Sequence, residues 1–196
     1  MPPEQAVIAS ALDLFWQKGY ADTSMAEIVA ATGLNRYAIY STFGSKRELF
    51  LAALDAYFVE GCERFEPVIL DQSTPAIDRL RQSMVLSIEM MDQKPNGCFM
   101  CHVAVELAAE DPKIAEAVSS YFTRIVDMIE IMMRDLAEEG HLNPNLSPRQ
   151  AAQLVFDTKL SMGVHGKAGT GRDRLEAIAA TMIAAVSTPS QTARVQ

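Results

Sequence analysis

The 196-residue sequence predicts an all-α protein of about nine helices, with an N-terminal three-helix domain followed by a C-terminal helical bundle. Three observations lead to this fold class. Apolar residues recur at spacings of three and four in segment after segment, which is the period of an amphipathic helix. Residues that cap helices stand at the start of several of these segments. No segment alternates apolar and polar residues in the way that predicts a strand.

The first two helices are marked by their ends. Apolar residues at helical spacing predict a first helix over residues 3–18, and Gly19 stops it. Ser24 and Glu27 have the spacing of a capping box, in which the hydroxyl and the carboxylate satisfy each other's backbone N–H groups. The second helix therefore begins after Ser24, and Gly33 ends it where the chain turns with positive φ.

The third helix follows after a short turn and has two different faces. Asn35 can cap it, and Gly44 closes it. Its apolar residues lie on one face, which leaves Arg36, Tyr37 and Tyr40 on the other. Two short helices joined by a tight turn form the helix-turn-helix pattern, whose second helix enters the major groove of DNA.

A fourth helix is predicted from Ser45 and Glu48, which form a second capping-box pattern. It should cover residues 46–65 and end ahead of Pro67. A helix of this length spans about 30 Å, too long for a small domain, so we expect it to link the N-terminal domain to the rest.

The remaining helices are bounded by Pro and Gly signals. Thr74-Pro75 and Ser147-Pro148 are cap-and-proline helix starts, and Gly140 is a stop. The predicted helices run from Pro75 to the break at Lys94–Gly97, over Cys98–Ala109, over Pro112–Glu139, over Pro148–Val164 and, after a turn at Gly166–Gly171, through Leu175–Val186.

This pattern predicts three parts. Residues 1–50 form a helix-turn-helix domain, residues 46–65 the linking helix, and residues 66–188 a ligand-binding and dimerisation domain. The tail of residues 189–196 is expected to be disordered.

The N-terminal stretch closely resembles the DNA-binding domain of the TetR (tetracycline repressor) family of transcriptional regulators. The shared landmarks are Gly19-Tyr20, Thr23-Ser24, Gly33, Tyr40, Phe43 and Ser45-Lys46. The resemblance implies a sequence-specific regulator, most often a repressor, that binds a palindromic double-stranded DNA operator as a homodimer and is released by a small-molecule effector. It also implies Arg36 and Tyr37 as base readers, and Thr23, Ser24, Tyr40 and Lys46 as phosphate contacts; Asn35 completes the predicted DNA-binding set.

Charge is consistent with specific rather than non-specific DNA binding. The net charge is −8, so the protein should not coat nucleic acid by neutralising phosphates. Residues 1–50 carry four basic and five acidic side chains, which leaves most of the negative charge to the rest of the chain. We expect affinity to depend on a dimer, formed mainly by residues 148–187, that presents two reading helices.

The sequence carries no signal for a membrane or for export. No run approaches the ~18 apolar residues of a membrane span, and the N-terminus lacks the pattern of a signal peptide. We expect a cytoplasmic protein without a membrane partner, whose three cysteines remain thiols.

Cys98, Cys101 and His102 support an alternative function. Their spacing fits c-type haem attachment, a thiol-redox pair or three ligands of a metal site. The simplest interpretation is that both cysteines pack a buried helix, so we expect no metal and no cofactor. No hydrolytic triad or phosphate-binding loop is apparent, and we expect no enzyme.

Eleven methionines suggest an adaptable ligand cavity, with ordinary core packing as the alternative. The predicted pocket comprises Phe58, Cys62, Met84, Ile88, Met91, Phe99, Val103 and Phe122.

Overall fold

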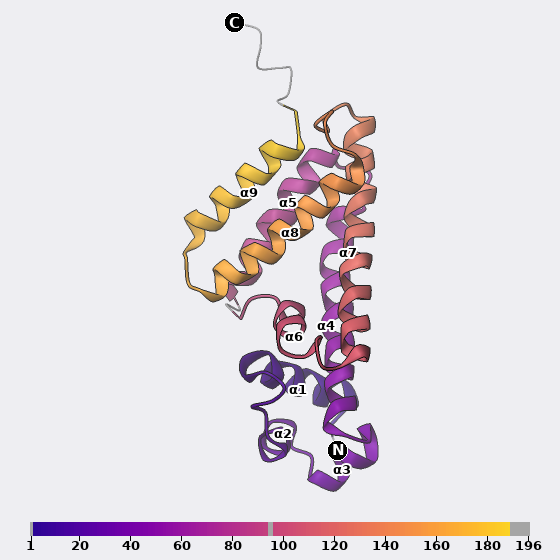
Figure 1. Cartoon of the computed structure of the whole chain (residues 1–196), viewed down its shortest axis with the longest axis vertical. Coiled ribbons are helices and arrows are strands. Elements are labelled where there is room, and N and C mark those ends of the chain that lie inside the picture. Colours follow the sequence, from indigo (N-terminus) through magenta and orange to yellow (C-terminus); the bar gives the residue numbers. More distant parts are fainter. Residues whose placement is uncertain (1, 94–95, 189–196) are drawn as a thin grey trace, which may run out of the picture. The chain divides into compact units, whose positions relative to one another are not determined.

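The computed structural model describes residues 2–93 and 96–188, and in these residues it is all-α, as predicted. The helices are α1 (Glu4–Lys18), α2 (Met25–Thr32), α3 (Arg36–Phe43), α4 (Lys46–Ile69), α5 (Ala76–Gln93), α6 (Phe99–Leu107), α7 (Pro112–Glu138), α8 (Pro148–Lys167) and α9 (Arg172–Val186) (Figure 1). One isolated antiparallel bridge joins Leu142 to Ser187. None of the described helices is long and apolar enough to cross a membrane.

The chain divides into two compact units, each of which combines two separate stretches of the sequence. Among the described residues, the N-terminal unit comprises residues 2–62 and 99–119, and the C-terminal unit the rest. The first unit therefore contains α6 and the start of α7 in addition to α1, α2, α3 and most of α4. The predicted tail at 189–196 lies outside the described residues.

The N-terminal unit has an aromatic core. The rings of Phe15 and Phe50 meet edge to face with their centroids 5.0 Å apart, and Tyr20 lies 4.8 Å from Phe50. Ile28 of α2 and Ile39 of α3 are completely buried. Burying a side chain of this size contributes about 1.5 to 3 kcal/mol, so each of the two short helices is held by its apolar face.

The predicted end of the fourth helix near Phe65 was wrong. Helix α4 continues to Ile69 with Pro67 inside it. Proline removes one backbone hydrogen bond, but in the last turn this loss affects few following residues. The N–H of Leu70 still donates to the carbonyl of Glu66 at 2.9 Å, so helical bonding resumes directly after the proline.

In the C-terminal unit, α5, α8 and α9 pack against one another (Figure 1). The predicted end of the eighth helix was too early, because α8 runs to Lys167 and includes Gly166. A Cβ atom at Gly166 would lie 3.2 Å from the Met91 side chain. This glycine therefore allows a close approach of α8 to α5, and the predicted Gly-rich turn begins only after Lys167.

Candidate nucleic-acid interface

Helix α3 is fixed by its cap and by its inner face. The side-chain oxygen of Asn35 accepts a 2.8 Å hydrogen bond from the N–H of Ala38, as the sequence predicts. Gly33 adopts φ 70° in the turn before it, the left-handed conformation that glycine enters at little cost. Leu34 and Ile39 are buried, so the helix cannot rotate about its axis without exposing them.

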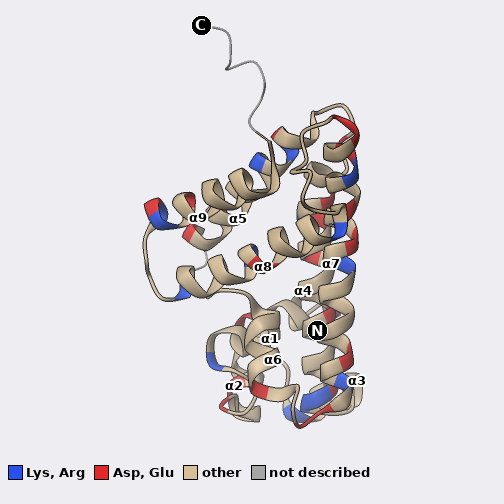
Figure 2. Ribbon diagram, turned by 45° about the horizontal axis from the view of Figure 1, so that its top comes forward, with Lys and Arg blue, Asp and Glu red and all other residues tan. Residues whose placement is uncertain are grey.

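The outer face of α3 carries the predicted base readers. Tyr37 is 81% exposed and Tyr40 is 38% exposed, and Arg36 is also exposed. The guanidinium carbon of Arg36 lies 5.6 Å from the centroid of the Tyr40 ring. Figure 2 shows basic positions on the ribbon of α3 and the start of α4. A cation and two phenol groups thus face outward from a helix whose inner side is locked.

Thr23 and Ser24, both predicted to contact phosphates, differ in accessibility. The Thr23 side chain is 1% exposed, and its hydroxyl donates to the Gly19 carbonyl at 2.6 Å. Ser24 is exposed and forms the predicted capping box with Glu27. Glu27 also pairs with Lys18, and this contact, with the hydrogen bonds from Ser24, lowers the pKa of its carboxyl to about 2. Thr23 therefore holds the turn, and Ser24 offers the accessible hydroxyl.

Lys46, the other predicted phosphate contact, is half-buried beside Tyr20. Its Nζ donates to the Tyr20 carbonyl at 2.5 Å and lies 4.2 Å from the centroid of the Tyr20 ring. Burial lowers the pKa of Lys46, while the charges of Glu106 and Glu27 act in the opposite direction. The Lys46 amine thus already stabilises this unit through its contact with Tyr20.

Glu106 of α6 is a residue that the sequence analysis did not identify. Its carboxylate accepts hydrogen bonds from the backbone N–H groups of Tyr20, at 3.1 Å, and Ala21, at 2.8 Å. A Cβ atom on Gly19 would lie 2.9 Å from one of the same carboxylate oxygens. The glycine and the carboxylate together fix the turn between α1 and α2.

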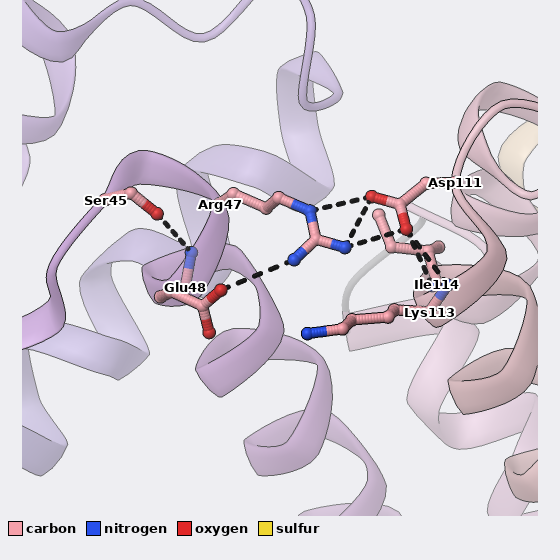
Figure 3. A network of polar contacts seen from close by, with 6 residues as sticks. All are labelled: Ser45, Arg47, Glu48, Asp111, Lys113 and Ile114. Carbon is pink, nitrogen blue, oxygen red and sulfur yellow. Dashed lines mark hydrogen bonds and ion pairs between the residues drawn. The ribbon is translucent and has the colours of Figure 1, made fainter.

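Arg47 and Asp111 form a second contact that the sequence analysis missed (Figure 3). Nε and Nη2 of Arg47 each donate to one oxygen of Asp111 at 2.7 Å. Asp111 also accepts from the backbone N–H groups of Lys113 and Ile114 at the start of α7. The arginine lowers the pKa of the Asp111 carboxyl below its usual value. This bidentate salt bridge joins the start of α4 to the start of α7 within the N-terminal unit.

The predicted ligand pocket is distributed over both compact units. Phe58, Cys62, Phe99 and Val103 belong to the N-terminal unit, and Met84, Ile88, Met91 and Phe122 to the C-terminal unit. Phe99 packs in the aromatic core of its unit, with its ring centroid 5.6 Å from that of Tyr57 and 6.0 Å from that of Phe50. The pocket as a single set of residues stays a prediction.

The cysteines form no disulfide. Cys62, Cys98 and Cys101 are all half-buried thiols. Among the described residues, no group of three or more His, Cys, Asp or Glu side chains is arranged to hold a metal ion.

Comparison with known families identifies both parts of the chain. Residues 7–53 match the family described as "Bacterial regulatory proteins, tetR family". Residues 76–182 match the family described as "Tetracyclin repressor-like, C-terminal domain". The second match alone covers more than half of the chain.

Curated relatives align along most of their length. The transcriptional repressor ComR of Escherichia coli K12 is 25% identical over 180 residues, which cover 91% of this chain and 86% of ComR. The transcriptional repressor BdcR of the same strain is 29% identical over 182 residues, which cover 91% of this chain and 84% of BdcR.

Solved structures share the fold. A cysteine-substituted TetR family regulator CifR, in complex with a 26-base-pair operator DNA, superposes with a TM-score of 0.84 at 22% identity, over 95% of this chain and 97% of that one. The reduced form of E. coli NemR superposes with a TM-score of 0.85 at 16% identity, over the same fractions of the two chains. These comparisons favour a DNA-binding regulator over the thiol or metal sensor built on Cys98, Cys101 and His102.

Proposed function

The chain belongs to the TetR family of bacterial regulatory proteins and is a DNA-binding transcriptional regulator, and we propose that it is a repressor whose helix α3 reads a palindromic operator. The observation that carries this proposal is the exposed face of α3, where Arg36 and Tyr37 project from a helix locked by Asn35 and Ile39. The names of ComR and BdcR, both repressors, support the direction of regulation.

The predicted DNA-binding residues fall into groups with different proposed roles. Arg36 and Tyr37 contact base edges, because arginine donates two hydrogen bonds to guanine in the major groove. Ser24, Tyr40 and Lys46 contact phosphates, which orient the protein on DNA without specifying sequence. Asn35 acts through its cap. The buried hydroxyl of Thr23 is committed to Gly19, which leaves only its backbone for a DNA contact.

A palindromic operator requires a symmetric dimer. We assign the dimer interface mainly to residues 148–187, the segment of α8 and α9, where Leu154 and Val164 are apolar and exposed. A two-fold axis through this segment presents two α3 helices to half-sites about one DNA turn apart. A small-molecule effector that favours another spacing releases the operator.

The protein acts by binding alone in this proposal and catalyses no reaction. A cytoplasmic location follows, because the chromosomal DNA that a bacterial regulator binds lies there.

The test is the operator affinity of an Arg36→Ala variant. Losing a bidentate base contact should cost about 1 to 3 kcal/mol and relax the preference at one base pair per half-site. Lys46→Ala should weaken all sequences alike and reduce the salt dependence of binding by about one counterion. Arg81→Ala, at an exposed arginine of α5, is the matched control and should change nothing. Unchanged affinity and base preference in Arg36→Ala would show that another helix reads the DNA.

A further inference from the structure

Lys159, a half-buried residue of the C-terminal unit, directs its amino group toward two buried serines. The side chain extends from α8, and its Nζ donates to the carbonyl of Ser83 and to the hydroxyl of Ser87, both at 2.8 Å. The same nitrogen lies 4.4 Å from the centroid of the Phe65 ring, near the end of α4. Three helices therefore converge on one amine.

The groups in contact with this amine are neutral. Ser83 and Ser87 are 0% and 4% exposed, and the Ser87 hydroxyl donates to the same Ser83 carbonyl at 3.0 Å. Among the described residues, no carboxylate lies within ion-pair distance of Lys159. Burial alone lowers the pKa of its amine to about 7. An ammonium group in this place would have no internal negative charge to offset its desolvation.

Arg79, one turn before Ser83 on the same face of α5, is a buried cation. Its side chain is 2% exposed, with Nη1 donating to the Ile69 carbonyl and Nη2 to Asp135. Its Nε is buried and has no hydrogen-bond partner in the described part of the chain. Arg79, Ser83 and Ser87 recur every four residues, so they form one stripe along the helix. This stripe and Lys159 together hold more buried donors than negatively charged acceptors.

Apolar residues flank the polar stripe. Met84 and Ile88 follow the two serines on α5, and Val155 and Met162 lie one turn to either side of Lys159 on α8; all four are buried. A cation with neutral polar neighbours inside apolar surroundings suits a ligand with an acidic head and an apolar body.

We propose that Lys159, positioned by Ser83 and Ser87, binds the carboxylate of a small apolar organic acid, and that this acid is the effector. The carboxylate supplies the charge that the unit itself does not give Lys159, and charged hydrogen bonds of this kind are stronger than neutral ones. The effector role of this acid rests on the proposed repressor function, whereas the anion site itself does not.

The test compares acids with matched neutral amides. Calorimetric titration of the full-length protein uses hexanoate, octanoate, benzoate and phenylacetate, each beside its own amide. We expect at least one acid to bind at least about tenfold more tightly than its amide, the effect of one charge-assisted hydrogen bond. If none of the four acids binds better than its amide, the site is not an anion site and Lys159 only braces α5 against α8.

Two variants and a control locate the effect. Lys159→Met, with folding checked by circular dichroism, should bind acid and amide alike; if it does not fold, Ser87→Ala, which removes one partner of the amine, should reduce the preference several-fold. Lys113→Met, at an exposed lysine of the N-terminal unit, should keep the wild-type preference. A preference that survives in Lys159→Met and in Ser87→Ala would overturn the assignment.

Operator binding separates this inference from the proposed function. In the wild type, an acid that binds should weaken operator affinity, and one that binds without this effect would overturn the effector role. If the wild type binds no operator but still prefers acids, the repressor function fails and the anion site stands. If it binds its operator and none of the acids, the anion site fails alone.

Discussion

Each unit contains a half-buried lysine with similar contacts, but the two lysines differ in the negative charge nearby. Lys46 in the N-terminal unit and Lys159 in the C-terminal unit each donate to a backbone carbonyl and lie over an aromatic ring, at 4.2 and 4.4 Å. The negative charges of Glu106 and Glu27 oppose the effect of burial on the pKa of Lys46. Lys159 has burial as the only cause of its lowered pKa. Lys46 thus has nearby carboxylates that offset its burial, whereas the described residues around Lys159 provide none, and we assign that role to a ligand.

The arginines of the two units are both paired with an aspartate and differ instead in their exposure to solvent. Arg47 and Asp111 of the N-terminal unit are 31% and 23% exposed, while Arg79 of the C-terminal unit is 2% exposed and its partner Asp135 is 25% exposed. Both pairs have a 2.7 Å contact, so they differ mainly in solvation. Water can replace a lost partner for Arg47 and cannot easily do so for Arg79.

The largest expected effect is therefore that of Asp135→Ala. This change leaves the Arg79 guanidinium buried with only a carbonyl partner, and we expect the free energy of unfolding to fall by about 3 kcal/mol. Urea denaturation followed by circular dichroism measures it. Asp78→Ala, which removes an exposed ion pair with Arg81, is the control and should cost less than about 0.5 kcal/mol. Equal losses in the two variants would contradict the contrast in solvation.

A smaller effect is expected from Gly19→Ala. Gly19 has φ 85° and ψ 169°, a region that other residues rarely enter, and the new Cβ would collide with the Glu106 carboxylate. We expect a loss of about 2 kcal/mol. Gly33→Ala, at φ 70° and ψ 4° with open space around it, should cost about 1 kcal/mol. If thermal unfolding ranks the two glycines in the reverse order, Glu106 does not fix the turn between α1 and α2.

The smallest effect is expected at Asp111, because its pair with Arg47 is partly exposed. The folded pKa of Asp111 lies below its usual 3.8, so the pair stabilises the protein fully above that value, and the contribution disappears as the pH falls through the lowered pKa. Asp111→Asn should therefore be slightly less stable than the wild type at pH 7, and this difference should shrink as the pH falls through the lowered pKa of Asp111. A difference that persists in acid would point to packing rather than charge.

Local signals in the sequence were enough to predict the helices that form the reading surface. The caps at Ser24 and Asn35 and the stop at Gly33 each involve residues within a few positions, so their spacing reveals them. The contacts of Glu106 with Tyr20 and Ala21 span 85 or more residues, and no local pattern predicts such a pairing.

The C-terminal unit offered one signal that the sequence analysis did not use. Ser83 and Ser87 occupy buried positions of an amphipathic helix, and Lys159 lies between Val155 and Met162 on another. Polar residues at apolar positions indicate a buried polar cluster, although only the structure shows that the two helices bring them together.

Selection of bound DNA from a random pool tests the central claim most directly, namely that α3 reads a palindromic operator. The wild type should enrich a palindrome whose half-sites are about one DNA turn apart, and Arg36→Ala should lose preference at the same base pair in both halves. A pool without a consensus, or an identical consensus from the two proteins, would contradict the account.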